Sequence, residues 1–311
     1  MSTSPWPLAS LLLATTSAFV GWTVGHGAPA PEAALVAAPE PATSVAETPA
    51  PAPVADVPPA TDPSTWPLKV PDLADVPQTP LGDSIRRGHE IVTHTRQALP
   101  DNVRAANHCS SCHLQAGTVA DAGPWVGVAG LFPMYRSRTG TVVTLEDRVN
   151  DCFERSMNGT ALPPGSAPMK DILAYMTWLS EGVPVGAAVE GRGFRKVADP
   201  PVPDAAHGAE VFATKCAACH GVAGAGLSGP DGTPIYPPLW GDEAFNIAAG
   251  MARLDTAAAF VRWNMPLGQG GTLTDQEAYD LAAYFTVQPR PDFARKDQDW
   301  PNGGKPRDAR Y

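Results

Sequence analysis

The apolar residues of this chain fall into three zones with different periods. The first is a continuous apolar run over residues 6–24. A helix needs about 20 such residues to cross a bilayer, and a long export signal has the same appearance. No Lys or Arg precedes Lys69, so no charge sets an orientation. Residues 1–27 are therefore predicted to be a signal peptide or a membrane anchor, and both interpretations stay open.

The second zone, residues 28–80, has neither a helical nor a strand period. Pro and Ala dominate it, as at Pro49, Pro51 and Pro53, with acidic residues scattered between them. Such a segment cannot bury enough apolar surface to offset the entropy of ordering it. We predict a disordered, semi-stiff linker, which behind an anchor would tether the folded part of the chain to a membrane.

The third zone has a helical period and shows it twice. One copy opens with residues 87–92 and closes with an apolar helix over residues 170–179, and the other opens with residues 207–212 and closes over residues 275–285. Thr274 or Asp275 is a suitable N-cap for the last of these helices. An internal repeat of roughly one hundred residues is too long for a solenoid unit, so it indicates two tandem domains.

These patterns predict an all-α fold, because no strong strand alternation accompanies the helical periods. The first domain is assigned to residues 81–185 and the second to residues 204–290, followed by a C-terminal tail over residues 291–311. Four prolines lie between residues 183 and 203 and mark the boundary between the domains.

The net charge is −10, from 22 basic and 32 acidic side chains. Phosphate binding needs a basic footprint, so this balance argues against a nucleic-acid partner. A small anionic substrate is compatible with it only if the fold gathers a local basic pocket.

Two copies of a C-x-x-C-H motif carry the clearest chemistry. They are Cys109, Cys112 and His113 in the first domain and Cys216, Cys219 and His220 in the second. Two thiols at this spacing can bond the vinyl groups of one haem c, and the adjacent His is placed to be the proximal iron ligand. A zinc site would need the two pairs about 15–20 residues apart, and a thioredoxin-like pair would need a βαβ context. The motifs therefore predict two covalently bound haem c groups.

A second axial ligand is available in the second domain. Met265 precedes Pro266 in a loop just ahead of the closing helix, 45 residues after His220. A thioether opposite His raises the reduction potential of a haem. Met251 is the competing candidate, and we predict Met265 because the adjacent proline can hold it in a defined loop.

The fifth cysteine, Cys152, is the corresponding candidate in the first domain, 39 residues after His113. The surrounding sequence predicts a helix on which Arg148 and Ser156 share its face, at i−4 and i+4. A guanidinium beside a thiol favours the thiolate, which is the form that binds iron and attacks sulfur. Two plainer interpretations remain: Cys152 as a small buried apolar residue, and Met157 as the iron ligand.

The chain from about residue 80 to its C-terminus resembles the dihaem thiosulfate dehydrogenases, also called tetrathionate synthases, of sulfur-oxidising bacteria. The resemblance rests on Tyr135-Arg136-Ser137-Arg138, on residues 146–159 around the cysteine, on Asn264-Met265-Pro266 and on the tail Asp299-Trp300-Pro301-Asn302-Gly303. It implies that the first haem has His and Cys ligands, His113 and Cys152, and is the active site. Arg138, Arg148 and Ser156 would then belong to the substrate pocket.

The same resemblance implies that the second haem, with His220 and Met265 as ligands, is the electron exit. Two thiosulfate ions would be coupled to tetrathionate, or the reverse, with electrons passing to a soluble carrier such as a small cytochrome c. Asn264 stands where some family members have a lysine that can ligate the oxidised iron, so lysine ligand switching is not expected. An exported enzyme of this kind would work in the periplasm, with the N-terminal segment as a cleaved signal or an inner-membrane anchor.

Two other functions fit the haem motifs. A membrane-tethered dihaem electron carrier would need no thiolate flanked by Arg and Ser, so Cys152 separates it from an enzyme. A dihaem peroxidase would need acid–base groups beside an open iron site, for which His89 and His94 are the spare histidines of the first domain. We interpret both as surface or helix residues.

Overall fold

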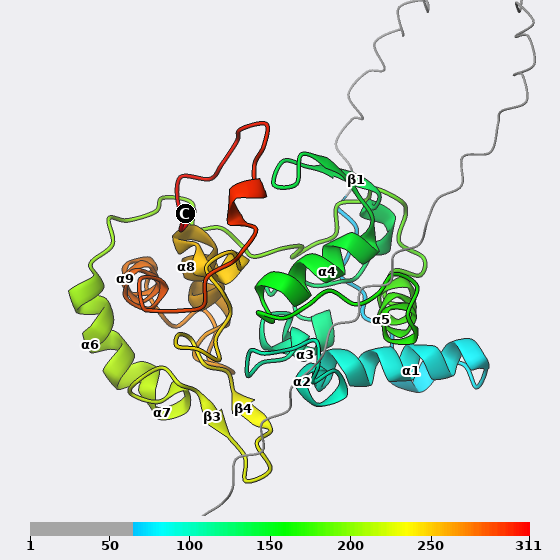
Figure 1. Ribbon diagram of the computed structural model, residues 1–311, viewed down its shortest axis with the longest axis horizontal. Helices are drawn as coiled ribbons and strands as arrows, with labels where there is room; N and C mark the ends of the chain where they lie inside the picture. The colour runs from blue at the N-terminus through cyan, green and yellow to red at the C-terminus, as the bar shows by residue number, and fades with distance from the viewer. Residues whose placement is uncertain (1–64) are drawn as a thin grey trace, which may run out of the picture. The chain divides into compact units, whose positions relative to one another are not determined.

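The computed structural model describes residues 65–311 (Figure 1). The predicted signal peptide or anchor, residues 1–27, and residues 28–64 of the predicted linker lie outside the described residues. Between residues 65 and 311, no helix combines the length and the apolarity that crossing a bilayer requires.

The first half is built on a pair of packed helices, α1 and α5, with α4 beside them (Figure 1). Thr79 begins α1 by accepting a hydrogen bond from the backbone N–H of Gly82, so the proline at the first helical position leaves no donor unpaired. Apolar residues at helical spacing meet in one core, where Ile85, Phe153 and Tyr175 are each 1% exposed. The helices are α1 (Pro80–Thr93), α2 (Thr95–Ala98), α3 (Leu114–Gly117), α4 (Leu145–Arg155) and α5 (Ala167–Trp178).

The second half repeats this plan with α6 packed on α9 and α8 against α9. Thr274 begins α9 with a capping box, in which its hydroxyl accepts from the N–H of Glu277 while the Glu277 carboxylate accepts from the N–H of Thr274. The predicted N-cap is thus confirmed. The helices are α6 (Ala205–Lys215), α7 (Ala217–His220), α8 (Leu254–Asn264) and α9 (Asp275–Thr286), and short 3₁₀ helices lie at Leu73–Asp75, Cys109–Ser111, Ala129–Leu131, Gly250–Ala252 and Lys296–Gln298.

The mostly helical class is confirmed, and two small antiparallel hairpins accompany the helices. Strand β1 (Met134–Arg136) pairs with β2 (Thr141–Val143), and β3 (Leu227–Ser228) pairs with β4 (Pro234–Tyr236). Strands of two or three residues are too short to show an alternating pattern, which is why the sequence predicted helices alone.

A glycine lies at the crossing point of the main helix pair in each half. A Cβ placed on Gly88 of α1 would lie 2.0 Å from the carbonyl oxygen of Asp171 on α5. A Cβ on Gly208 of α6 would lie 2.0 Å from the carbonyl oxygen of Asp280 on α9. Helix backbones can approach this closely only where no side chain stands between them. A glycine at the crossing point therefore allows the short distance between the helices in both pairs.

Gly88→Ala and Gly208→Ala should each destabilise the protein by about 1–3 kcal/mol, because the helices must separate to admit a methyl group. In an exposed helix interior the same change would stabilise the protein by up to about 1 kcal/mol. The sign of the change in unfolding free energy therefore shows whether the helices are in close contact at this glycine. Thermal unfolding of the haem-loaded variants measures it. Gly250→Ala is the control, since its Cβ would meet no atom closer than 4.0 Å. A variant that melts at or above the wild-type temperature would show that the contact is not rigid.

The segment predicted as the boundary between the domains packs on the first half. The carbonyl oxygens of Gly191 and Gly193 accept hydrogen bonds from the N–H groups of Asp121 and Gly123, each at 2.8 Å. Gly191 and Gly193 therefore hold the loop that carries Gly123.

The prediction of a disordered linker up to residue 80 is wrong for its last part, residues 65–79. The N–H of Trp66 donates to the carbonyl of Ala188 at 2.7 Å, and Val76 is 2% exposed in the core of the first half, so burial orders this stretch.

The two halves are joined by specific hydrogen bonds. The side-chain amide of Asn246 donates to the carbonyl oxygen of Glu154 at 2.8 Å, and that of Asn264 donates to the carbonyl oxygen of Asp121 at 3.1 Å. Arg138 of the first half donates to the carbonyl oxygen of Ala248 in the second at 2.9 Å. These bonds fix the walls of the cleft described below.

Candidate functional site

Both motif histidines are oriented by a backbone carbonyl. Nδ1–H of His113 donates to the carbonyl oxygen of Gly123 at 2.6 Å, and Nδ1–H of His220 donates to that of Pro237 at 2.9 Å. A carbonyl only accepts, so it holds the proton on Nδ1 and leaves the Nε2 lone pair free for a metal. Each histidine therefore has the tautomer that an axial haem ligand needs.

A largely apolar cavity in the second half contains Cys216, Cys219 and His220 in its wall. Met265 and Met251 both line it, so the cavity brings the predicted ligand and its competitor to the same place. Aromatic residues such as Phe212 and Phe285 complete the wall, and such apolar side chains suit the flat face of a porphyrin. Because the cavity also offers thiols, an imidazole and a thioether, its residues fit haem c. Ser110, Ser111, Cys112 and Leu114 of the first half also line this cavity.

Four of the cysteines fall into two electrostatic classes. Burial raises the pKa of Cys109 and Cys112 to about 12, and burial raises that of Cys216 to about 11. Such surroundings favour neutral sulfur, which agrees with cysteines destined to be thioethers. Cys152 differs from these three.

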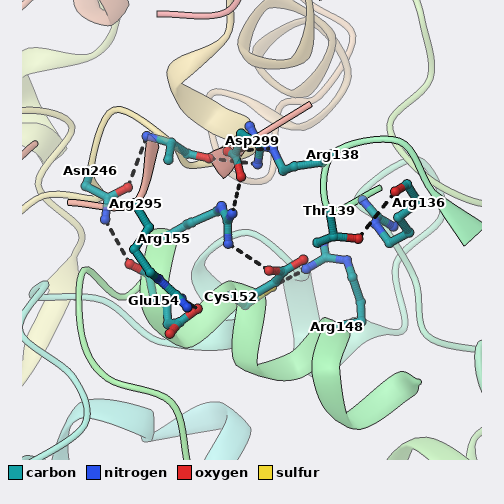
Figure 2. A network of polar contacts seen from close by, with 12 residues as sticks. Arg136, Arg138, Thr139, Arg148, Cys152, Glu154, Arg155, Asn246, Arg295 and Asp299 are labelled. Carbon is teal, nitrogen blue, oxygen red and sulfur yellow. Dashed lines mark hydrogen bonds and ion pairs between the residues drawn. The ribbon is translucent and has the colours of Figure 1, made fainter. Parts of the chain in front are cut away.

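Cys152 carries the one thiol in the described chain whose pKa is lowered. Burial alone would raise the pKa of Cys152, but the charge of Arg148 and the proximity of His113 outweigh it and bring the pKa to about 6. An Nη atom of Arg148 donates to Sγ of Cys152 at 2.9 Å, a contact that Figure 2 shows across one turn of α4. The structure thus brings together the predicted ligand pair of the first half, His113 and Cys152, and places Arg148 on the sulfur.

Helix α4 presents these groups because its ends are well capped. Thr144 and Asp147 form a capping box at its start, with hydrogen bonds of 2.8 Å and 3.1 Å. Val149 and Phe153 of the same helix are buried in the core of the first half. Met157, the alternative iron ligand, is 4% exposed and belongs to that same core.

A cleft of about 750 Å³, which we call the cationic cleft, lies beside this helix. Its cationic side chains are Arg136, Arg138, Arg148, Arg155, Lys196, Arg253 and Arg307, and its carboxylates are Asp151, Asp255 and Asp308. Ser156, which follows the last residue of α4, also lines it. Cys152 itself is not in the lining and lies behind Arg148. In a chain of net charge −10, this local excess of positive charge is of the kind that attracts small anions.

The cationic side chains differ in how far the protein already uses them. Nε of Arg138 lies 3.3 Å from the Asp299 carboxylate, and Arg155 donates to the same carboxylate at 2.6 Å and to Asp151 at 2.7 Å (Figure 2). Nε of Arg136, by contrast, is buried with no hydrogen-bond partner in the described residues. Burial lowers the pKa of Arg136, and the nearby charge of Arg148 lowers it further.

The C-terminal tail holds the wall of the cleft in place. Asp299, whose side chain is 3% exposed, joins Arg138 to Arg155 and also accepts a hydrogen bond from the hydroxyl of Tyr311. The N–H of Trp300 donates to the carbonyl oxygen of Arg138 at 2.7 Å, and the guanidinium of Arg138 stacks 4.7 Å from the Trp300 ring centroid. Arg138 thus lines the cleft as predicted, but much of its hydrogen-bonding capacity is spent on the tail.

Sequence reasoning missed Arg136, Arg155 and Arg253 as members of the cleft. Arg136 and Arg155 lie inside two of the segments on which the resemblance rests, but the sequence alone offers no reason to assign either of them a role. Arg253 precedes α8, far from those segments, and nothing in the sequence places it beside them.

Comparison with known proteins gives two family matches. Residues 101–185 match the SoxA/TsdA cytochrome c domain, and residues 205–286 match the cytochrome c family. One match falls in each of the two halves described above.

Individual relatives extend the match across most of the chain. The thiosulfate dehydrogenase of Psychrobacter arcticus is 48% identical over 243 residues, which are 78% of this chain and 74% of that protein. The thiosulfate dehydrogenase of Allochromatium vinosum is 46% identical over 238 residues, 75% of this chain and 88% of that protein. Among solved structures, the as-isolated thiosulfate dehydrogenase (TsdBA) of Marichromatium purpuratum matches with a TM-score of 0.71 and 36% identity, over 73% of this chain and 50% of that one.

Proposed function

The chain belongs to the thiosulfate dehydrogenase family, and on this basis we propose that it couples two thiosulfate ions into tetrathionate at the cationic cleft beside Cys152. The observation that carries the proposal is the contact of 2.9 Å between Arg148 and the sulfur of Cys152, at the edge of a cleft rich in arginine. It combines a thiolate with a binding site for an anionic sulfur compound. A pure electron carrier would need neither.

The cofactors we propose are two covalently bound haem c groups, one on each C-x-x-C-H motif. When bound, the haem of the first half would take up the electrons released at Cys152, and that of the second would pass them to an external acceptor. Residues of the first motif line the same cavity as the second motif, which supports a short path between the two. His113 and Cys152 would hold the first iron, and His220 and Met265 the second.

Binding two substrate ions is the first physical problem of the reaction. Two dianions held about 5 Å apart repel each other by roughly 13 kcal/mol at an effective dielectric constant of about 20. Guanidinium groups offset such repulsion with charge-assisted hydrogen bonds to sulfonate oxygens. Arg148 and Arg136 lie closest to the sulfur chemistry, since both are electrostatically coupled to Cys152.

Cys152 divides the oxidation into two steps. In the first, a bond forms between Sγ of Cys152 and the outer sulfur of one thiosulfate with loss of two electrons, for which the haem groups, when bound, would supply the one-electron acceptors. In the second, the outer sulfur of another thiosulfate attacks the outer sulfur of this adduct, so that the new sulfur–sulfur bond forms as the bond to Sγ breaks. Tetrathionate departs and the thiolate is restored beside Arg148. The same steps in reverse would reduce tetrathionate.

The proposal extends to the acceptor and to the compartment. A small soluble cytochrome c suits the overall acidic surface if its own surface is basic. The apolar run at residues 6–24 supports export to the periplasm, with the segment either cleaved or kept as an inner-membrane anchor.

Haem-loaded wild-type protein should oxidise thiosulfate when supplied with an artificial one-electron oxidant. The expected stoichiometry is one tetrathionate for two thiosulfate and two electrons, measured by chromatography of the sulfur anions against the oxidant consumed. Boiled protein and a monohaem cytochrome c serve as controls. If the wild-type protein leaves both thiosulfate and tetrathionate unchanged, the electron-carrier function is the correct one.

A further inference from the structure

The cationic cleft continues beyond the residues that surround Cys152. Arg148 and Arg136 line the end that belongs to α4 and β1, whereas Arg253 and Thr256 line it from the second half. Arg138 of the first half also lines the cleft, and its guanidinium donates to the carbonyl oxygen of Ala248 in the second half at 2.9 Å. The cleft therefore has cationic side chains from both halves in its wall.

Arg253 is the arginine at the far end of the cleft that the protein uses least. One of its Nη atoms donates to the hydroxyl oxygen of Thr256 at 2.9 Å, and no carboxylate pairs with it among residues 65–311. Its Nε is buried and has no hydrogen-bond partner in that part of the chain. An N–H group in this state gains a full hydrogen bond when an anion arrives.

The carboxylates at this end have other partners. Asp255 lies 3.3 Å from an Nη atom of Arg307 and accepts from the hydroxyl of Tyr279 at 3.3 Å. Asp308 accepts a hydrogen bond from the backbone N–H of Asp255 at 3.0 Å. Lys196, which has no ion pair in the described chain, adds a further positive charge at the rim. The balance at this end therefore remains favourable for an anion near Arg253.

We propose that Arg253, with the Thr256 hydroxyl and Lys196, forms a second anion subsite that holds the second dianionic sulfur oxyanion of the reaction. This inference rests on the proposed function and deepens it. The first anion is bound by Arg148 and Arg136 next to Cys152. The second waits at Arg253, where the arginines of the cleft separate its charge from the first until it attacks.

The subsite can be tested by counting anions. Sulfate is the probe, because it is a tetrahedral dianion that does not react. Titration calorimetry of the oxidised holoprotein at constant ionic strength should give two sulfates per wild-type chain and one per Arg253→Gln chain. In turnover, Arg253→Gln should raise the thiosulfate concentration for half-saturation about tenfold or more, the usual effect of losing a charge-assisted hydrogen bond, with a smaller change in kcat.

Two further variants separate binding from structure. Arg253→Lys keeps the charge and should keep both sulfates, which decides the matter if Arg253→Gln loses haem or melts early. Arg295→Gln removes one positive charge from outside the cleft, at a side chain that is 50% exposed, and should leave both measurements unchanged.

Three results would count against the subsite. One is a wild-type chain that binds a single sulfate. Another is an Arg253→Gln enzyme with wild-type half-saturation, which would overturn the subsite and leave the proposed function intact. The third is a wild-type protein inert to thiosulfate and to tetrathionate, which would overturn the proposed function itself.

Discussion

Replacing Cys152 with serine should lower thiosulfate oxidation by about a thousandfold or more while both haem groups remain attached. Serine keeps the size and the hydrogen bond to Arg148 but cannot form the sulfur–sulfur adduct. Its hydroxyl is also a far weaker nucleophile and iron ligand than a thiolate. Steady-state turnover with an artificial oxidant measures the loss. Haem content comes from the absorbance of the reduced protein, and it should not change because Cys109, Cys112 and His113 are untouched.

The spectrum of the first haem gives a second readout that a merely structural role for Cys152 would not change. Loss of a thiolate ligand should alter the absorption and electron paramagnetic resonance of one haem and leave the other unaffected. The matched control is Met157→Leu, which removes the other nearby sulfur at almost constant volume in the core. If Met157→Leu changes that haem and Cys152→Ser does not, the ligand assignment in the first half is wrong.

The sequence could predict this site only as far as local spacing reaches. The C-x-x-C-H motifs, the helix over Cys152 and the contact with Arg148 all depend on residues within a few positions of one another. The structure confirms the helix and places the Arg148 guanidinium on the sulfur. The same holds for the two helix pairs, whose apolar spacing and N-cap at Thr274 were evident from the chain.

What the sequence could not predict depends on distant segments meeting. Arg138 reaches Asp299 and the carbonyl oxygen of Ala248, which are more than a hundred residues away, and so its guanidinium is held by the tail. Asp299 and Trp300 contributed to the resemblance with no role assigned to them. In the structure they hold the Arg138 guanidinium, Asp299 by an ion pair and Trp300 by stacking. Arg253 enters the cleft from the second half, and no periodicity of the first half points to it.

The arginines of the cleft differ in whether a carboxylate pairs with them. Arg138 and Arg155 are paired with Asp299, so they shape the wall more than they bind. Arg148, Arg136, Arg253 and Lys196 have no carboxylate within ion-pair distance in the described residues, so their charges are not offset by a direct partner. The buried carboxylate of Asp299 thus divides the arginines into two groups: those it pairs with, which hold the wall, and those it leaves without a carboxylate partner.

Substituting Arg148 is expected to have the second-largest effect on activity. Arg148→Gln should lower kcat/KM for thiosulfate by about a hundredfold or more, because it removes the charge partner of a buried sulfur anion and a substrate contact together. Breaking such a buried pair costs about 3–5 kcal/mol. Arg148→Lys keeps a positive charge but cannot bond the sulfur and a sulfonate with one planar group, so it should fall between glutamine and wild type.

Steady-state kinetics separate the two roles of Arg148. Loss of substrate binding raises KM, whereas loss of the thiolate's partner lowers kcat and changes the spectrum of the first haem, and we expect both in Arg148→Gln. Arg295→Gln again serves as the charge-matched control outside the cleft, with kinetics like those of the wild type. If Arg148→Gln turns over thiosulfate within about twofold of wild type, the contact between guanidinium and sulfur is not the basis of activity, and the anion must bind elsewhere in the cleft.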